Sequence, residues 1–310
     1  MEGDEIMNKI VTKFNIVGSA FGHGAQIYTT HKSPDYLRYM YNLINKLGDR
    51  FHWYSTIGNE NILEEREIEL KGYNYNAVVT HNTKLANTVS NLVLKNNEFC
   101  IIIGGDHSCG IGTWSGIIKG LNAKDNFGLI WIDAHMDAHT YETSPSKCYH
   151  GMPLAVLLGK GDEVLCKIGL HGRKIKPTNL VLIGIRSFED GEKKLLEENG
   201  VKIFYMDDVR SLGIQRVFEE ALQIITNNTQ EGFGVSIDLD AFDPEDTPGV
   251  GSPEPDGLNF EETSQYLPLL FSSEYLKCLE IVEFNPEIDK EDKTANVLHK
   301  ILSILDNTVS

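Results

Sequence analysis

The sequence predicts an α/β fold in which a mostly parallel sheet carries helices on both faces. Short apolar runs alternate along the chain with longer amphipathic segments, which is the pattern of parallel strands joined by crossover helices. Several runs are almost continuously apolar, as in Phe-Gly-Leu-Ile-Trp-Ile at 127–132, and such runs are typical of strands buried on both faces. Polar residues follow several of these runs directly. We therefore expect them at the carboxyl edge of the sheet, where open α/β folds bind their ligands.

The expected elements cover most of the chain. The apolar runs predict strands at 13–17, 51–57, 99–103, 127–132, 180–185, 201–205, 233–237 and 277–282. Helices are expected at 33–48, 76–97, between 103 and 127, just after 153, and at 189–199, 214–226, 260–271 and 292–304. Ser33 as cap, Pro34 at the first position and Gly48 as stop delimit the first helix. Residues 59–75 are acidic and irregular and receive no assignment. Because no repeat, low-complexity segment or linker divides the chain, residues 1–310 are expected to form a single domain.

The composition limits the classes of partner. The chain has 310 residues, of which 41% are hydrophobic, and this is enough for a sizeable core. Its formal net charge of −17 argues against binding to nucleic acid or to an anionic membrane surface, and it is compatible with a small cationic substrate. An ordinary acidic cytosolic protein explains the charge equally well.

Nothing in the sequence predicts export or insertion into a membrane. Residues 1–5 are acidic and are not followed by an apolar signal core, and no apolar run approaches transmembrane length. The five cysteines are an odd number without a Cys-x-x-Cys pair. Cys100 lies in an apolar run and Cys278 beside one, so buried thiols are expected rather than disulfides or zinc ligands. We therefore expect a cytoplasmic protein.

Ligand-type residues recur at every second position after the apolar run 127–132, as Asp133, His135, Asp137 and His139. Side chains two residues apart point the same way in an extended chain, so the first three of these residues should converge on one small volume. Two carboxylates and an imidazole in such a volume resist desolvation unless a cation lies between them. The pattern therefore predicts a metal site.

Other ligand-type residues follow separate expected strands, namely His107, Asp238 with Asp240, and Glu283. The candidate ligands are four carboxylates and two imidazoles: His107, Asp133, His135, Asp137, Asp238 and Asp240. Four negative charges balance two divalent cations, and a mixed set without thiolate favours manganese or a similar octahedral ion, with cobalt as another choice, over structural zinc. Two such ions hold a bridging water and lower its pKa, which makes hydroxide available. These residues predict a binuclear metal hydrolase.

Four motifs together resemble the ureohydrolases, and most closely the arginases. They are Gly-Gly-Asp-His-Ser at 104–108, Asp-Ala-His-Met-Asp at 133–137, His-Gly-Met-Pro at 150–153 and Ser-Ile-Asp-Leu-Asp at 236–240. Further signatures of the family are the glycine-rich loop at 18–24, Ile-Arg-Ser at 185–187, and Glu-Phe-Asn-Pro at 283–286 followed by Lys-Thr-Ala at 293–295. The motifs run nearly from end to end in the order of the family, which makes their combination specific.

The resemblance implies a three-layer α/β/α domain with a largely parallel sheet of about eight strands and two manganese ions on the six ligands. It implies that a metal-bridging hydroxide attacks the guanidinium carbon of L-arginine to give urea and L-ornithine. Asp137 is expected to bind metal and to carry a proton to the leaving amine. His150 is expected to shuttle protons, and Glu283 to pair with the guanidinium. By analogy with the family, the chain is expected to form homo-oligomers, either trimers or hexamers.

The resemblance departs from the family at the residues expected to bind the other end of the substrate. His139 stands where arginases usually have an asparagine that contacts the α-carboxylate, and Lys147 with Cys148 replaces the usual Gly-Asn. Ser146 matches a serine of the same loop, and Glu189 stands where many arginases have an aspartate that contacts the α-ammonium. These donors, and Lys147 as a cation, still favour an α-amino acid, so L-arginine is expected to be preferred over agmatine.

Several alternatives stay open. Agmatinase or another guanidino-acid hydrolase has the same chemistry with a different substrate tail. A formiminoglutamase is expected to have other residues around 104–108, and a zinc amide hydrolase on the related fold has fewer ligands. A catalytically silent regulatory relative is disfavoured because no ligand is lost. A NAD-dependent enzyme lacks its fingerprint, because the loop at 18–24 does not have the spacing Gly-x-Gly-x-x-Gly.

Overall fold

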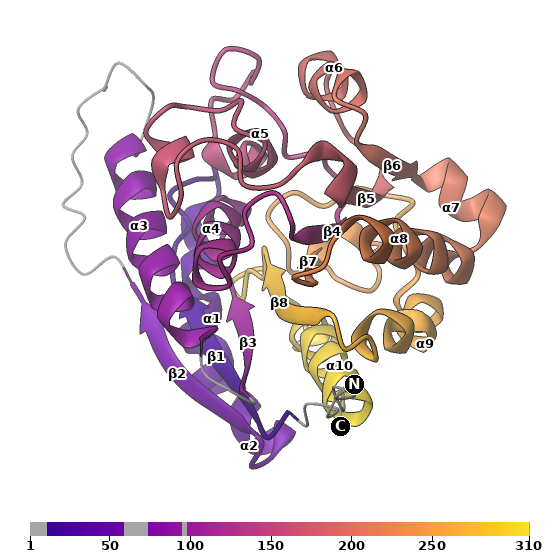
Figure 1. The fold of residues 1–310 in the computed structure, drawn as a ribbon. Coiled ribbons are helices and arrows are strands. Elements are labelled where there is room, and N and C mark those ends of the chain that lie inside the picture. Colours follow the sequence, from indigo (N-terminus) through magenta and orange to yellow (C-terminus); the bar gives the residue numbers. More distant parts are fainter. Residues whose placement is uncertain (1–10, 59–73, 95–97, 310) are drawn as a thin grey trace, which may run out of the picture.

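A computed structural model describes residues 11–58, 74–94 and 98–309. Its centre is one sheet of eight parallel strands in the order β2-β1-β3-β8-β7-β4-β5-β6 (Figure 1). The strands are β1 (Lys13–Ser19), β2 (Phe51–Ile57), β3 (Glu98–Ile103), β4 (Gly128–Ile132), β5 (Leu180–Ile185), β6 (Lys202–Tyr205), β7 (Phe233–Asp238) and β8 (Leu276–Val282). The predicted parallel sheet is confirmed, and every predicted strand is present with ends that differ by no more than two residues.

Helices cover both faces of this sheet. They are α1 (Ser33–Asp35), α2 (Leu43–Leu47), α3 (Tyr75–Leu92), α4 (Gly110–Gly120), α5 (Pro153–Leu157), α6 (Asp190–Glu198), α7 (Met206–Leu212), α8 (Ile214–Asn228), α9 (Phe260–Phe271) and α10 (Lys293–Thr308). One apolar core joins the sheet to α2, α7, α8, α9 and α10, and a second joins the opposite face to α3, α4, α5 and α6. The three-layer α/β/α architecture is therefore confirmed.

The alternation of side chains along β4 divides its residues between the two cores. Ile130 and Ile132 belong to the core beneath α8, whereas Leu129 and Trp131 belong to the core beneath α4. All four are almost fully buried. A strand with helices on both sides needs apolar residues at every position, and this explains why the run is apolar without a break.

The helix expected at 33–48 is wrong as a single element. The chain forms α1, then a π-helical turn at Tyr36–Met40, and then α2. Asn42 interrupts it because its φ of 58° lies in the left-handed region, which asparagine tolerates better than most residues. Ser33 lies inside α1 and its N-cap is Lys32, whereas Gly48 ends α2 as expected, with a φ of 97°.

Other boundaries differ by a few residues. The last helix continues to Thr308, and α7 is an additional seven-residue helix that the sequence did not predict. The helix expected at 76–97 is observed as α3, although 95–97 lie outside the described residues, as do 59–73 of the unassigned segment. All five cysteines are free, and Cys100 and Cys278 are buried as expected. Within the described ranges, no helix is long and apolar enough to cross a membrane.

Candidate active site

The candidate ligands come from the ends of four neighbouring strands in the middle of the sheet. His107 begins a short 3-10 turn after β3, and Asp133 is the first residue after β4. Asp238 is the last residue of β7, and Glu283 is the first after β8. Because β3, β8, β7 and β4 are adjacent and parallel, their carboxyl ends meet at one edge of the sheet.

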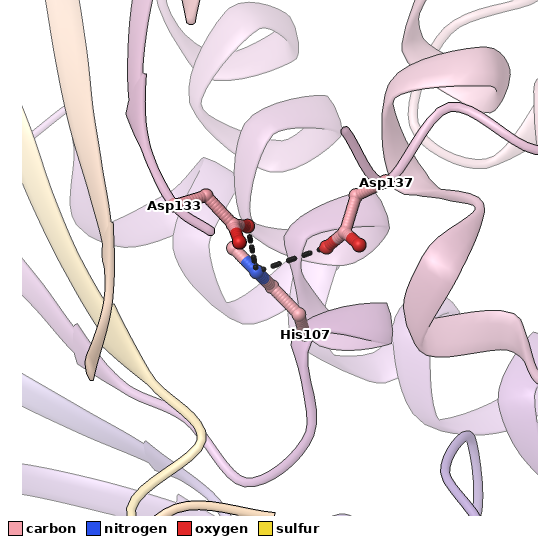
Figure 2. A group of neighbouring side chains, drawn as sticks. All are labelled: His107, Asp133 and Asp137. Atoms are coloured by element: carbon pink, nitrogen blue, oxygen red, sulfur yellow. Dashed lines mark ion pairs between the residues drawn. The ribbon is translucent and has the colours of Figure 1, made fainter. Parts of the chain in front are cut away.

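The imidazole of His107 lies at the centre of a group of carboxylates. Its Nδ1 is 3.2 Å from Oδ2 of Asp133 and 3.1 Å from Oδ2 of Asp137, and Figure 2 shows both side chains pointing towards it. The same Nδ1 is 3.0 Å from Oδ2 of Asp238. All four side chains are buried, so these charges lie close together in a region shielded from solvent.

A second group shares one carboxylate with the first. Nδ1 of His135 lies 3.1 Å from Oδ2 of Asp240 and 3.6 Å from Oδ1 of Asp133. Asp133 thus offers one oxygen to each group. The structure brings five of the candidate ligands together as two adjoining clusters, one formed by His107, Asp133 and Asp137 and the other by Asp133, His135 and Asp240. The sixth, Asp238, joins the first cluster through its contact with His107.

The local backbone fixes several of these carboxylates. The backbone N–H of His135 donates to Oδ1 of Asp133 at 2.6 Å, and that of Asp240 donates to Oδ1 of Asp238 at 2.8 Å. The chain is not extended as far as Asp137, whose φ is 47°. Strict alternation is therefore not what brings Asp137 to the site. A left-handed turn directs its carboxylate towards His107 instead.

The electrostatics of the site favour a bound cation. Burial, and then repulsion by Asp133, raise the pKa of Asp137 to about 6. Burial, and then the charge of Asp240, raise the pKa of Asp238 well above its usual range. Burial opposes protonation of His107, but the surrounding carboxylates outweigh it and hold its pKa well above the ordinary value. Its Nδ1 is also buried without a well-aligned hydrogen bond. A cluster of carboxylate oxygens and imidazole nitrogens suits a hard or borderline divalent metal ion.

Glu283 and His150 lie beside this metal-ligating region and line the same pocket. Oε1 of Glu283 accepts a hydrogen bond of 2.8 Å from the backbone N–H of His107, and it lies 3.5 Å from Nδ1 of His150. Burial opposes protonation of His150, but hydrogen bonds with Cys148 and Glu283 outweigh it and raise its pKa well above the ordinary value. The imidazolium form of His150 is therefore favoured.

The far end of the pocket holds a second network of ionisable side chains. Nε2 of His139 lies 2.9 Å from Oε2 of Glu189 and 3.5 Å from Oε1 of Glu192, while its Nδ1 contacts the hydroxyl of Thr143 at 3.1 Å. His139 and Glu192 are buried, but the side chain of Glu189 is 58% exposed. The three residues are close enough to be a metal-binding group. Since the imidazole already hydrogen-bonds to Glu189, the network is complete without a metal.

The two neighbouring loop residues behave differently. Ser146 lines the pocket, and its hydroxyl accepts a hydrogen bond of 3.2 Å from the backbone N–H of Cys148. Lys147 is not among the residues that line the pocket, and its Nζ donates to the carbonyl of Tyr141 at 2.7 Å. In this structure the ammonium group of Lys147 is therefore bound within its own loop, and its role as a cation for the substrate stays a prediction.

Two carboxylates of the pocket were missed by the sequence analysis. Glu192 has one sequence signal, because it stands three residues after Glu189 and closes a capping box at the start of α6. Burial raises its pKa to about 8. Glu254 has no such signal. Its Oε1 accepts a hydrogen bond of 3.0 Å from the hydroxyl of Ser187 and lies 3.6 Å from Nε2 of His135.

Comparison with known proteins agrees with this geometry. The model of the arginase family matches residues 12–305. The arginase of Bacillus subtilis (strain 168) is 38% identical over 294 residues, which are 94% of this chain and 96% of that relative. Among solved structures, the arginase of Bacillus caldovelox has a TM-score of 0.86 and 37% identity, with coverage of 95% of this chain and 98% of that one. The arginase of Entamoeba histolytica, solved in complex with L-ornithine, has a TM-score of 0.84 and 29% identity, and the match covers 95% of this chain and 99% of that one.

The fold and the residues at its carboxyl edge define a ureohydrolase, which is a hydrolase that acts on guanidino groups. At this level of identity and coverage the family can be stated plainly. The chain belongs to the arginase family.

Proposed function

We propose that the protein hydrolyses L-arginine to L-ornithine and urea at a centre of two manganese ions. The observation that carries this proposal is the convergence of the six ligand residues at one edge of the sheet, where His135, Asp137, Asp238 and Asp240 line the same pocket as Glu283. Curated arginases that are 38% identical over nearly the whole chain support the choice of substrate. We also propose that residues 1–310 act as one domain, since one sheet carries every ligand.

The two clusters at the strand ends would hold the ions. His107, Asp133, Asp137 and Asp238 fit one ion, and Asp133 and Asp238 with His135 and Asp240 fit its neighbour. When bound, two such ions neutralise the buried carboxylates and make hydroxide available near neutral pH. The four aspartates match the charge of two divalent cations, and this match explains why so many carboxylates can be buried together.

Glu283 is the residue proposed to orient the guanidinium group. Its Oε1 is held by the backbone N–H of His107, so the carboxylate has a fixed position beside the ligand cluster. A planar guanidinium pairs well with a carboxylate through two parallel N–H donors. The pair would hold the guanidinium carbon over the ligand clusters and exclude other orientations.

Asp137 and His150 are proposed to move the proton. The carboxylate of Asp137 lies in the ligand cluster and also lines the pocket, so it can take a proton there and pass it to the leaving amine. His150 lies at the pocket wall with its imidazolium form favoured, which suits a group that exchanges protons between solvent and the leaving amine.

The far end of the pocket is proposed to bind the amino-acid part of arginine. Glu189 provides negative charge for the α-ammonium, and the hydroxyl of Ser146 provides a donor for the α-carboxylate. His139 lines the same pocket and is held by its contacts with Glu189 and Glu192. A site that offers a carboxylate to an ammonium group and a hydroxyl donor to a carboxylate matches an α-amino acid better than agmatine, which has no carboxylate.

A panel of guanidino compounds tests the proposal. The manganese-loaded protein is incubated with L-arginine, agmatine and guanidino acids, and urea is measured. We expect L-arginine to have the highest kcat/KM. Equal or faster hydrolysis of agmatine would assign the protein to the agmatinases and leave the metal centre standing, whereas urea release at the full rate from chelator-treated protein would contradict the metal centre itself.

A further inference from the structure

A buried carboxylate that the proposed chemistry does not use lies directly behind the ligand cluster. Glu280 is fully buried in the middle of β8. It is the register partner of Ser236 on β7, and Ser236 is the register partner of Trp131 on β4. Three adjacent strands thus place these side chains in one row across the sheet, on the face covered by α4.

His107 contacts this row from above. Its ring stacks on that of Trp131, with centroids 4.0 Å apart and planes 5° from parallel. Its Nε2, the ring nitrogen opposite the carboxylate cluster, lies 3.0 Å from Oγ of Ser236. The Ser236 hydroxyl in turn donates to Oε2 of Glu280 at 2.7 Å. The three groups form a continuous chain that runs from the ligand cluster into the core.

This chain has one consistent direction of donation. A carboxylate can only accept, so the Ser236 hydroxyl donates to Glu280 and is left to accept from Nε2–H of His107. With a metal ion in the cluster, the imidazole would carry its one proton on Nε2 and offer the lone pair of Nδ1 to the ion. Such hydrogen bonds on the far nitrogen fix the tautomer and orientation of metal-binding histidines.

The surroundings of Glu280 give its charge few other partners. The indole N–H of Trp114 donates to Oε2 at 2.8 Å, and the thiol of Cys109 lies 3.8 Å from Oε1. Among the residues that the structure describes, His107 is its one ion-pair partner, with Nε2 at 3.9 Å from Oε2. Burying an ionised carboxylate is costly unless a charge compensates it. A divalent cation held by the ligand cluster would supply such a charge at the other end of the His107 imidazole.

We propose that Glu280 is a positioning residue that acts through Ser236 to orient His107 and to strengthen its bond to a metal ion. The inference rests on the proposed metal centre. Glu280 does not touch the substrate or the ions. Its contribution is to hold one tautomer of His107 and to make the imidazole a better donor, and removal of such partners typically weakens metal affinity about 10–100-fold.

A purely structural role for Glu280 predicts something different. If Glu280 only satisfies the Trp114 indole and the Ser236 hydroxyl, its replacement lowers the stability of the metal-free protein but leaves the affinity for metal unchanged. Binding of Mn²⁺ to metal-free protein, followed through the electron paramagnetic resonance of free Mn²⁺, separates the two roles. The melting temperature of each metal-free variant is measured beside it.

Ser236→Ala and Glu280→Gln are the two test variants. We expect both to bind Mn²⁺ about 10–100-fold more weakly. Ser236→Thr keeps the hydroxyl and is expected to restore affinity. Cys109→Ala is the matched control, because it removes a neighbour of Glu280 from the same buried site without breaking the chain to His107, and its affinity is expected to equal that of wild type.

The outcomes are distinct. Wild-type affinity in folded Ser236→Ala overturns the inference, and this variant decides alone if Glu280→Gln does not fold. A lower melting temperature with unchanged Mn²⁺ affinity assigns Glu280 to core stability and likewise overturns it. If the wild-type protein itself binds no Mn²⁺, the proposed metal centre is wrong. This result is distinct from the one that overturns the role of Glu280, in which the wild type and the variants bind Mn²⁺ with the same affinity.

Discussion

The two ends of the pocket are built in different ways. At the metal-ligating end, residues such as His107, Asp133 and Asp238 are fully or almost fully buried and lie at or shortly after the carboxyl ends of central strands. At the substrate-tail end, the residues come from the loop before α5 and from the start of α6, and the side chain of Glu189 is largely exposed. One end is fixed by the core, and the other by hydrogen bonds within and between loops.

This difference means that the residues proposed for the reaction and those proposed for substrate recognition lie in parts of the fold that tolerate substitution differently. Displacing a ligand at the strand ends requires a change in the packed sheet, which costs several kcal/mol in a close-packed interior. A loop residue such as Ser146 or Glu189 can change with little effect on the core, since loops tolerate substitution better than the elements they connect. The departures from the arginase pattern lie at the tail end, whereas all six of the predicted ligand residues are present.

The largest effect is expected from removing the metals or their shared ligand. Chelation should abolish urea release and lower the melting temperature, because ions bound only by the folded state stabilise it by about 4 kcal/mol at 1,000 times Kd. Asp133→Asn should lose metal, since Asp133 offers an oxygen to both clusters. Metal content and urea release are measured. Asp207→Asn, at an exposed aspartate of α7, is the control and should keep both, and full activity of Asp133→Asn would refute the shared-ligand role.

A smaller effect is expected from His150, which lies beside Glu283 in the same pocket. His150→Asn should lower turnover about 10²–10⁴-fold, the usual contribution of a general acid or base, with metal content unchanged. Turnover and bound manganese are measured together, and His171→Asn at an exposed histidine serves as control. Unaltered turnover would assign His150 to packing.

At the tail end, the expected effect is selective rather than general. Glu189→Ala should lower kcat/KM for L-arginine about tenfold, or ~1.4 kcal/mol, because an exposed carboxylate is lost from the ammonium site. The value for the analogue lacking the α-amino group should not change. Glu198→Ala on the same helix is the control. An equal loss of kcat/KM for both substrates would mean that Glu189 supports the loop and does not bind the α-ammonium group.

The smallest effect is expected at Lys147. Because its Nζ donates to the Tyr141 carbonyl and does not line the pocket, Lys147→Met should change kcat/KM for L-arginine by no more than roughly a factor of two, the range of about 0.5 kcal/mol typical of surface substitutions. A loss as large as that of Glu189→Ala would place its charge on the substrate carboxylate after all.

The same contrast explains what the sequence could predict. Strands buried on both faces leave an unbroken apolar run, so β5 was predicted with its observed ends. Helix α9 was also predicted with its observed ends. A ligand that directly follows such a run, as Asp133 does, inherits its position from the strand. The loop residue Asp137 was placed correctly for a different reason, since its left-handed turn is not visible in the alternation of residues.

Contacts between distant loops had no such signal. Glu254 meets Ser187 and His135 only because two loops fold over the same edge of the sheet. Glu280 is one of two charged residues in the sequence of β8, with Lys277, and its role depends on which residues of neighbouring strands share its register. Register across a parallel sheet is set by the packing of the whole fold, so one sequence does not reveal it.

The order of strands also bears on how the protein folds. Strands β2-β1-β3 form one side of the sheet and β4-β5-β6 the other, and β8 with β7, which come last in the chain, lie between them. As the chain is synthesised, the two sides can form before the strands that join them exist. Because β8 and β7 lie between β3 and β4, and β7 carries Asp238, the six ligand residues come together only in the complete sheet. Pairing of segments so distant in the sequence is intrinsically slow, and until it occurs the proposed metal site is incomplete.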